Sequence, residues 1–209
     1  MSGQVGIAIL AKAPVPGQAK TRLIPALGAE SAARLQDWLL LRTVALAFDA
    51  GIGPVCLWWE GAHDHPTLAA CRALGPLESW RQPDGDLGDR MLAAIVESAA
   101  PGGTLVIGTD CPAFTVSHLR TAAAMLAAHD AVLYPAEDGG YVLVGMRHAA
   151  PEAFTDMPWG GATVMELTRQ RLRTLGWTWS EPATLWDVDR PEDLTRLLAA
   201  WPEAGAAIR

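Results

Sequence analysis

Carboxylates that could hold a cation follow two stretches of the sequence that read as extended. Asp110 comes shortly after the apolar or β-branched run 104–107, and Pro112 ends any continuation of a strand there. Asp187 and Asp189 stand two residues apart on an extended segment, so their side chains share one face. Magnesium and manganese ions favour carboxylates and phosphate oxygens as ligands. The sequence therefore indicates that a metal or a polar ligand binds at Asp110.

Each of these carboxylates also has a purely structural interpretation. Asp110 could cap the helix expected to begin near Val116, or it could fix a turn. Asp189 and Glu192 match the spacing of a capping box for the last helix, which would account for Asp189 but not for Asp187. The other polar segments of the chain provide the evidence for choosing between ligand binding and a structural role.

A basic stretch with two prolines and a glycine follows the first apolar run, residues 4–11. It contains Lys12, Lys20 and Arg22, and its composition excludes regular secondary structure. A basic, glycine-containing loop after the first strand of an α/β sheet suits phosphate groups. It is not a Walker A loop, because Ala19 stands where that pattern requires glycine before Lys-Thr. A solvated loop with incidental charge is the alternative.

A segment rich in glycine and aspartate, residues 83–91, opens a helix expected to reach residue 99. Asp86 and Asp89 could simply cap this helix, since acidic side chains are favoured at a helix N-terminus. Gly85 and Gly88 instead suggest close approach of a ligand to the backbone.

Residues 137–140, Glu-Asp-Gly-Gly, lie between two expected strands and are typical of a hairpin turn. The same turn could also cover the cleft that contains Asp110, and the two interpretations are compatible. Cys111 follows Asp110 directly, but no histidine pairs with it, so a small buried residue is expected rather than a nucleophile.

The segments that position these residues alternate between strand and helix patterns, which predicts an α/β fold. Strands are expected over 4–11, 54–59, 78–82, 104–107, 130–136, 141–146 and 177–180, the last as an edge or antiparallel strand. Helices are expected over 29–50, 67–74, 116–128 and 163–175, and a further helix opens near residue 190. Ligands of such sheets bind outside the carboxyl ends of the strands, where the polar segments above are placed.

Composition narrows the class of protein. The 209 residues and the 50% apolar content predict one globular domain, residues 1–209, with a substantial core. A net charge of −7 argues against a nucleic-acid partner. Three cysteines without ligand spacing indicate neither zinc nor disulfides and fit the cytoplasm. No apolar stretch is long enough to span a membrane, and a homodimer is left open.

Five ordered motifs together carry a resemblance to a known family. They are Ala11-Lys-Ala-Pro-Val-Pro-Gly17 with Lys20-Thr-Arg-Leu23, Gly85-Asp-Leu-Gly88 with Arg90-Met91, Ile107-Gly-Thr-Asp-Cys-Pro112, Glu137-Asp-Gly-Gly-Tyr141 and Asp187-Val-Asp-Arg-Pro-Glu-Asp-Leu194. Over nearly its whole length the chain resembles a bacterial glycosyltransferase family of the nucleotide-diphospho-sugar transferase superfamily, often associated with radical-SAM or arsenosugar genes. The resemblance implies a single-domain, Rossmann-like GT-A fold, with a mostly parallel sheet, flanking helices and a small antiparallel extension.

The resemblance also implies roles for individual residues. The nucleotide would be bound by Ala11, Lys12, Gly17, Lys20, Arg22, Gln82, Gly85, Gly88 and Arg90, with Lys20 and Arg22 on the phosphates and residues 82–88 beside the base. Mg²⁺ or Mn²⁺ would be held by Asp110, assisted by Asp187 or Asp189. The transferred group or the acceptor would meet Asp138, Gly139, Gly140 and Trp159, and Asp138 and Lys20 are the candidate catalytic residues.

The chain departs from the family pattern at two places. Trp159 is followed by Gly-Gly-Ala where relatives have a hydroxyl residue, so a polar contact from that loop is not expected. The Asp-X-Asp metal motif of the superfamily is reduced to Asp110.

Three functions remain open from the sequence. Glycosyl transfer from a nucleotide-diphospho-sugar to a small acceptor agrees with the family resemblance. Nucleotidyl transfer from a nucleoside triphosphate agrees with the basic loop at residues 20–23, which also resembles phospholactate guanylyltransferases. A non-catalytic nucleotide-binding module is the third, and the presence of Lys20, Arg22 and Asp110 together argues against it.

Overall fold

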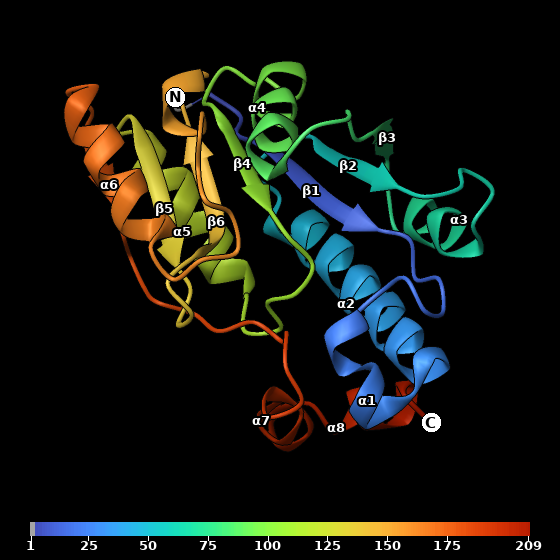
Figure 1. The fold of residues 1–209 in the computed structure, drawn as a ribbon. Helices are drawn as coiled ribbons and strands as arrows, with labels where there is room; N and C mark the ends of the chain where they lie inside the picture. Colours follow the sequence, from blue (N-terminus) through green and yellow to red (C-terminus); the bar gives the residue numbers. More distant parts are fainter. Residues whose placement is uncertain (1–2) are drawn as a thin grey trace.

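Seven strands form one sheet in the computed structural model, which describes residues 3–209 (Figure 1). The strands are β1 (Gly6–Lys12), β2 (Val55–Glu60), β3 (Leu77–Arg81), β4 (Thr104–Ile107), β5 (Ala131–Pro135), β6 (Tyr141–Met146) and β7 (Trp179–Ser180). Their order is β3-β2-β1-β4-β6-β5-β7. Within these residues β6 runs antiparallel to both neighbours, and the other pairs are parallel. The mostly parallel α/β sheet expected from the sequence is confirmed.

The helices cover both faces of this sheet. They are α1 (Ile24–Leu27), α2 (Ala29–Ala50), α3 (Pro66–Ala73), α4 (Leu87–Glu97), α5 (Val116–Leu126), α6 (Val164–Thr174), α7 (Asp193–Ala200) and α8 (Pro202–Ala207), with short 3₁₀ turns at Thr21–Leu23 and Pro151–Ala153. In β1, Ile7 and Ile9 pack with α2, α3 and α5, whereas Ala8 between them packs with α4 and α6. Side chains alternate between the faces of a strand, so a strand covered on both faces must be apolar throughout.

The longest helix, α2, ends as the sequence predicts. Gly51 adopts a left-handed conformation, with φ 62° and ψ 29°, and its N–H donates to the carbonyl of Phe48. A third apolar cluster joins the N-terminal half of α2, through Leu35 and Leu39, to α7 and α8. This cluster also includes Leu27 of α1, and Figure 1 shows α8 directly below α1.

The antiparallel part that the resemblance implies is formed by β6, which lies inside the sheet between β4 and β5. The turn at 136–140 is too short for a crossover, so β5 and β6 form a hairpin, as expected. In this turn Gly139 has φ 93° and the N–H of Gly140 donates to Asp138 Oδ1 over 2.9 Å. Strand β7 is an edge strand and runs parallel to β5.

The two capping motifs read from the sequence have different outcomes. Asp86 and Asp89 form a capping box at the start of α4, as expected. The predicted capping box of Asp189 is wrong, because Asp193 is the residue whose carboxylate accepts bonds from the N–H groups of Asp189 and Arg190, over 3.0 and 2.7 Å. The side chain of Asp189 is therefore available to a different partner.

No helix within residues 3–209 has the length and apolar character that a membrane crossing requires.

Candidate active site

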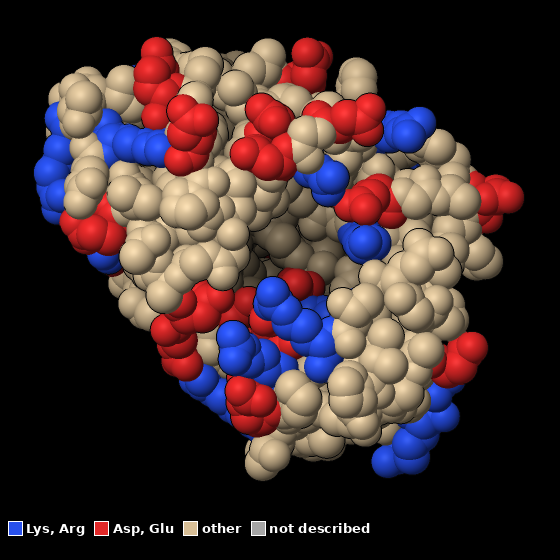
Figure 2. Space-filling view, viewed as in Figure 1, with Lys and Arg blue, Asp and Glu red and all other residues tan. Residues whose placement is uncertain are grey.

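A cavity of about 590 Å³ opens at the carboxyl ends of β1, β2 and β4. Figure 2 shows it as a central hollow with an uncharged floor and charged side chains around its rim. Its lining combines the basic loop, the end of β4 and the segment before α7. This position agrees with the rule for ligand sites in open α/β sheets.

At one end of the cavity, the basic loop is bound to two carboxylate segments. Lys20 Nζ lies 2.7 Å from Asp110 Oδ1 and donates to the carbonyl of Val188 over 2.6 Å. The side chain of Lys20 is only 6% exposed, although its backbone adopts a left-handed conformation with φ 48°. Arg22 forms an ion pair with Asp189. The loop therefore places two cations among the carboxylates that the sequence singled out.

Asp187 is the most crowded of these carboxylates. Burial, together with the negative charges of Asp138 and Asp110, raises the pKa of Asp187 to about 6, and Lys20 opposes this shift. A nearby cation would stabilise the charged form of a carboxylate in such surroundings. Asp110 and Asp187 both line the cavity, so they face the same space.

These residues fit a divalent ion that shares its coordination with a ligand. Among residues 3–209, no three His, Cys, Asp or Glu side chains gather closely enough to hold an ion by themselves. Mg²⁺ commonly takes one or two protein carboxylates and completes its shell with phosphate oxygens and water. Asp110 and Asp187 match that donor set, with Asp110 also paired with Lys20, and Asp189 is paired with Arg22.

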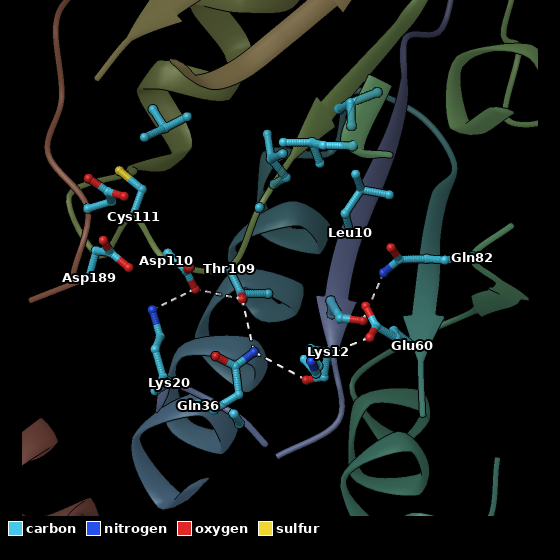
Figure 3. Close-up of a pocket in the computed structure, with 18 of the residues that line it drawn as sticks. Leu10, Lys12, Lys20, Gln36, Glu60, Gln82, Thr109, Asp110, Cys111 and Asp189 are labelled. Carbon is cyan, nitrogen blue, oxygen red and sulfur yellow. Dashed lines mark hydrogen bonds and ion pairs between the residues drawn. The ribbon is translucent and has the colours of Figure 1, made fainter. Parts of the chain in front are cut away.

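A buried amide positions Asp110. Gln36 on α2 is 3% exposed, and its Nε2 donates to Thr109 Oγ1 over 3.1 Å and to the carbonyl of Lys12 over 3.3 Å. Thr109 Oγ1 in turn donates to Asp110 Oδ1 over 3.2 Å. Figure 3 shows this chain of contacts, which connects the end of β1 to the carboxylate after β4. Sequence reasoning missed Gln36, although a glutamine on the apolar face of α2 was a signal that could have found it.

The opposite end of the cavity holds a second group of charges. Glu60, at the end of β2, lies 3.4 Å from Lys12 Nζ and 2.8 Å from Arg90 Nη1. Gln82 Nε2 donates to the carbonyls of Ala11 and Trp58, over 3.0 and 2.9 Å. Sequence reasoning missed Glu60, because a single acidic residue at the end of a strand carries no motif.

The structure brings many, but not all, of the residues predicted for the nucleotide and the metal to this cavity. The residues in its lining are Ala11, Lys12, Lys20, Arg22, Gln82, Asp110, Asp187 and Asp189. The predicted residues outside this lining are Gly17, Gly85, Gly88 and Arg90. Arg90 nevertheless donates a hydrogen bond to Glu60, which lines the cavity.

The two glycines before and within α4 have structural reasons instead. A Cβ on Gly88 would stand 2.8 Å from Trp159 Cζ2 and 3.0 Å from Phe154 Cβ. A Cβ on Gly85 would stand 2.4 Å from Asp89 Oδ2, and φ of Gly85 is 122°. Packing and backbone conformation therefore account for both glycines, and the cavity lining does not support their expected contact with the nucleotide.

A smaller cavity of about 240 Å³ adjoins the first, and the two share Arg22, Asp187 and Asp189 in their linings. Asp138 lines this second cavity, with its neighbour Glu137. The sequence placed Asp138 across the cleft from Asp110. The structure separates them into adjoining cavities, both close enough to Asp187 to raise its pKa.

The other residues predicted for the transferred group do not line either cavity. Trp159 packs against Phe154 and Tyr141, with ring centroids 6.5 and 6.4 Å away. A Cβ on Gly139 would stand 2.2 Å from the carbonyl oxygen of Ala162, so this glycine allows close packing of two backbones. Gly140 serves the turn described above.

Cys111 is buried, as expected. Burial raises the pKa of its thiol to about 12, which excludes a thiolate at neutral pH.

Comparisons with known structures agree with this architecture. A proposed nucleotide-diphospho-sugar transferase from Desulfovibrio desulfuricans G20 is 28% identical, covers 98% of this chain and 96% of its own, and superposes with a TM-score of 0.82. Rv0371c from Mycobacterium tuberculosis H37Rv, in complex with manganese, is 20% identical, with coverage of 95% and 100% and a TM-score of 0.53. CMP:2-keto-3-deoxy-manno-octonic acid synthetase, in complex with CTP, is 12% identical, with coverage of 96% and 99% and a TM-score of 0.59.

The last two likenesses show the fold alone, and the first supports the expectation of a transferase. The comparison with curated proteins gives no match. A family described as "uncharacterized protein conserved in bacteria" (DUF2064) matches residues 43–161, which include β2 to β6. The chain therefore belongs to the DUF2064 family and has the fold of the nucleotide-diphospho-sugar transferases.

Proposed function

We propose that this protein is a metal-assisted glycosyltransferase that uses a nucleotide-diphospho-sugar and a small acceptor. The observation that carries the proposal is the charge of the main cavity. Three cations line it, Lys12, Lys20 and Arg22, and they face four carboxylates, Glu60, Asp110, Asp187 and Asp189. A ligand with several phosphate charges can enter such a lining only when a divalent cation accompanies it.

The charge balance favours a diphosphate over a triphosphate. Lys20 and Arg22 are each already paired with a carboxylate, so little positive charge is left over for phosphate groups. A nucleotide-diphospho-sugar with one divalent ion adds almost no net charge to the cavity. A nucleoside triphosphate with one ion leaves about two negative charges to be neutralised by the same two side chains.

The chain's own residues then have distinct tasks. Asp110 and Asp187 would hold Mg²⁺ or Mn²⁺, which stabilises the developing charge on the leaving diphosphate when bound. Lys20 donates to the phosphate oxygens from a position held by the carbonyl of Val188. Gln36 and Thr109 keep Asp110 in place.

Asp138, in the adjoining cavity, would receive the acceptor. A hydroxyl oxygen of the acceptor forms a bond to the anomeric carbon, and the bond from that carbon to the diphosphate oxygen breaks. The electron pair leaves with the diphosphate, and the hydroxyl proton passes to the carboxylate of Asp138. This carboxylate lines the second cavity and is close enough to affect the pKa of Asp187.

Nucleotidyl transfer is the second candidate. It is favoured by the adjacency of Lys20 and Arg22 beside the carboxylates Asp110 and Asp189, since two cations at one point suit a pyrophosphate leaving group.

Thermal unfolding with nucleotides tests the proposal. A nucleoside diphosphate or nucleotide sugar with Mn²⁺ should raise the unfolding temperature more than a nucleoside triphosphate with Mn²⁺ does, and the reverse order would favour nucleotidyl transfer. Asp110→Ala should abolish the metal-dependent part of the shift. Asp49→Ala, which removes an exposed carboxylate from the end of α2, is the matched control. If no nucleotide gives a metal-dependent shift, a transferase of either kind is excluded.

A further inference from the structure

We propose that the end of the cavity around Glu60 selects nucleotides with a keto base, guanine or uracil, over those with adenine or cytosine. This inference rests on the proposed function, in that it takes the ligand to be a nucleotide. It adds a residue that determines which base is accepted.

The layout of the cavity places the base at this end. Figure 3 shows Lys20, Asp110 and Asp189 on one side of the cavity and Lys12, Glu60 and Gln82 on the other. The first group belongs to the loop after β1, the end of β4 and the segment before α7, whereas Glu60 and Gln82 lie at the ends of β2 and β3. With phosphates at the first group, the rest of the nucleotide extends along the strand ends toward Glu60.

Glu60 is a carboxylate held between two cations. One oxygen lies 3.4 Å from Lys12 Nζ and the other 2.8 Å from Arg90 Nη1. Its side chain is 40% exposed, and the residue lines the cavity. A carboxylate has about four acceptor positions, so these two contacts leave acceptor capacity for a ligand.

Gln82 holds this arrangement in place and offers no donor of its own. Its amide nitrogen has two hydrogens, and the carbonyls of Ala11 and Trp58 accept from that nitrogen. Its Oε1 lies 3.4 Å from Arg90 Nη1, on the side of Glu60. The charged groups of this end that line the cavity are therefore an anionic acceptor, Glu60, and a cationic donor, Lys12.

This set of groups matches one class of base. Guanine and uracil each have a ring N–H beside a carbonyl oxygen, so the N–H can donate to Glu60 while the carbonyl accepts from Lys12. Adenine and cytosine have an unprotonated ring nitrogen beside an amino group, so in the same position they would place an acceptor against the carboxylate and a donor against Lys12. Such a reversal leaves polar groups unpaired and is costly.

Apolar side chains nearby suit the flat faces of a base. Leu10, Leu87 and Met91 line the same cavity. Leu87 is 44% exposed, unusually so for a large apolar side chain. Covering it with an aromatic ring would remove apolar surface from water.

Calorimetric titration with GDP, UDP, ADP and CDP in the presence of Mn²⁺ tests the inference. GDP or UDP, or both, should bind at least tenfold more tightly than ADP and CDP, and the GDP-to-UDP ratio identifies which keto base is preferred. Glu60→Ala should bring the four affinities to within about threefold of one another, because the acceptor is lost. Glu97→Ala, which removes an exposed carboxylate from the end of α4, should keep the wild-type preference.

Glu60→Gln is the second variant and keeps the size of the side chain. Its amide can donate as well as accept, so binding of ADP and CDP should improve relative to GDP and UDP. Equal binding of the four nucleotides by the wild type, or a keto preference that persists in Glu60→Ala, would overturn this inference while the proposed function stands. Failure of all four nucleotides to bind would overturn both.

Discussion

Lys20 Nζ lies 2.7 Å from Asp110 Oδ1, although the two residues come from different loops of the sheet. The same nitrogen donates to the carbonyl of Val188, so one buried ammonium joins the loop after β1, the end of β4 and the segment before α7. This arrangement offsets negative charge at the place where the proposed metal and phosphates bind. Lys20 is thus the cation on which the electrostatic balance of the site depends.

Lys20→Met should weaken binding of a nucleoside diphosphate by about 10- to 100-fold, because a charge-assisted hydrogen bond contributes about 1.5–3 kcal/mol. Isothermal titration calorimetry with Mn²⁺ measures the effect. Methionine fits the same narrow space, and the left-handed backbone already accommodates a side chain of this length.

The matched control for this variant is Arg72→Met, which removes an exposed cation from the last turn of α3, outside the lining of the cavity. It changes the net charge of the protein by the same amount and should leave the affinity within about twofold of the wild type. An unchanged affinity in Lys20→Met would remove Lys20 from the phosphate site.

Gln36→Leu should lower the free energy of unfolding by about 1–3 kcal/mol, because Thr109 and the carbonyl of Lys12 lose a buried partner. It should also weaken Mn²⁺ binding, measured by calorimetry, since Asp110 loses its support. Thr43→Val is the matched control, because this buried hydroxyl on α2 donates to the carbonyl of Leu39 in its own helix and, within the described residues, to no other segment. If both variants bind Mn²⁺ equally well, Gln36 has a structural role alone.

Gly88→Ala should destabilise the protein by about 1–3 kcal/mol, because the added methyl group meets Trp159 and Phe154 in a filled space. Nucleotide affinity should stay within about twofold of the wild type. Gly108→Ala is a control for stability alone, because within residues 3–209 its Cβ would meet nothing within 4 Å, but Gly108 lines the cavity. Chemical denaturation and titration of the same samples separate the two effects. A large loss of affinity with normal stability would make Gly88 a ligand contact after all.

The stability of the protein should fall in acid partly through Glu181. Arg169 donates two hydrogen bonds to this carboxylate, over 2.9 and 2.7 Å, and these bonds hold the pKa of Glu181 below its usual value. A lowered pKa means that the pair stabilises the fold above the pKa of the unfolded chain. That stabilisation is lost as the pH falls through the lower pKa of the folded state.

Glu181→Gln should therefore lower the unfolding temperature near pH 7 by about 2–4 °C, corresponding to about 1 kcal/mol. The difference from the wild type should shrink as the pH falls through the lowered pKa of Glu181 in the folded state, where the wild-type carboxylate becomes protonated. Thermal unfolding followed by circular dichroism over this fall in pH measures it. A difference that stays constant with pH would show that the charge of Glu181 contributes nothing.

The sequence alone determined the strands, the longer helices and the edge of the sheet that carries the site, but it did not predict α1 or α8. Apolar runs predicted the strands β1, β2 and β4, and Gly51 marked the end of α2. These signals are local, because each depends on a side chain's preference for burial or for a backbone conformation. The polar loops after the strands followed from the same pattern, since connections lie at the surface.

The tertiary structure alone decided which polar side chains meet. The order of the strands brings Glu60 to Lys12 and Arg90, and it brings Gln36 to Thr109 across the end of β1. Neither pairing follows from spacing along the chain. The tertiary structure also pairs the side chain of Asp189 with Arg22, whereas the sequence predicted that Asp189 caps a helix.

Packing likewise decided the surroundings of Gly88, which the sequence could not separate from a ligand contact. A glycine that makes room for a ligand and one that makes room for Trp159 look the same in a sequence. Only the neighbouring atoms in the folded chain distinguish them. The sequence therefore determined where chemistry is possible in this protein. The folded chain decided which side chains are close enough to perform it, because electrostatic and hydrogen-bond interactions depend on distances between segments.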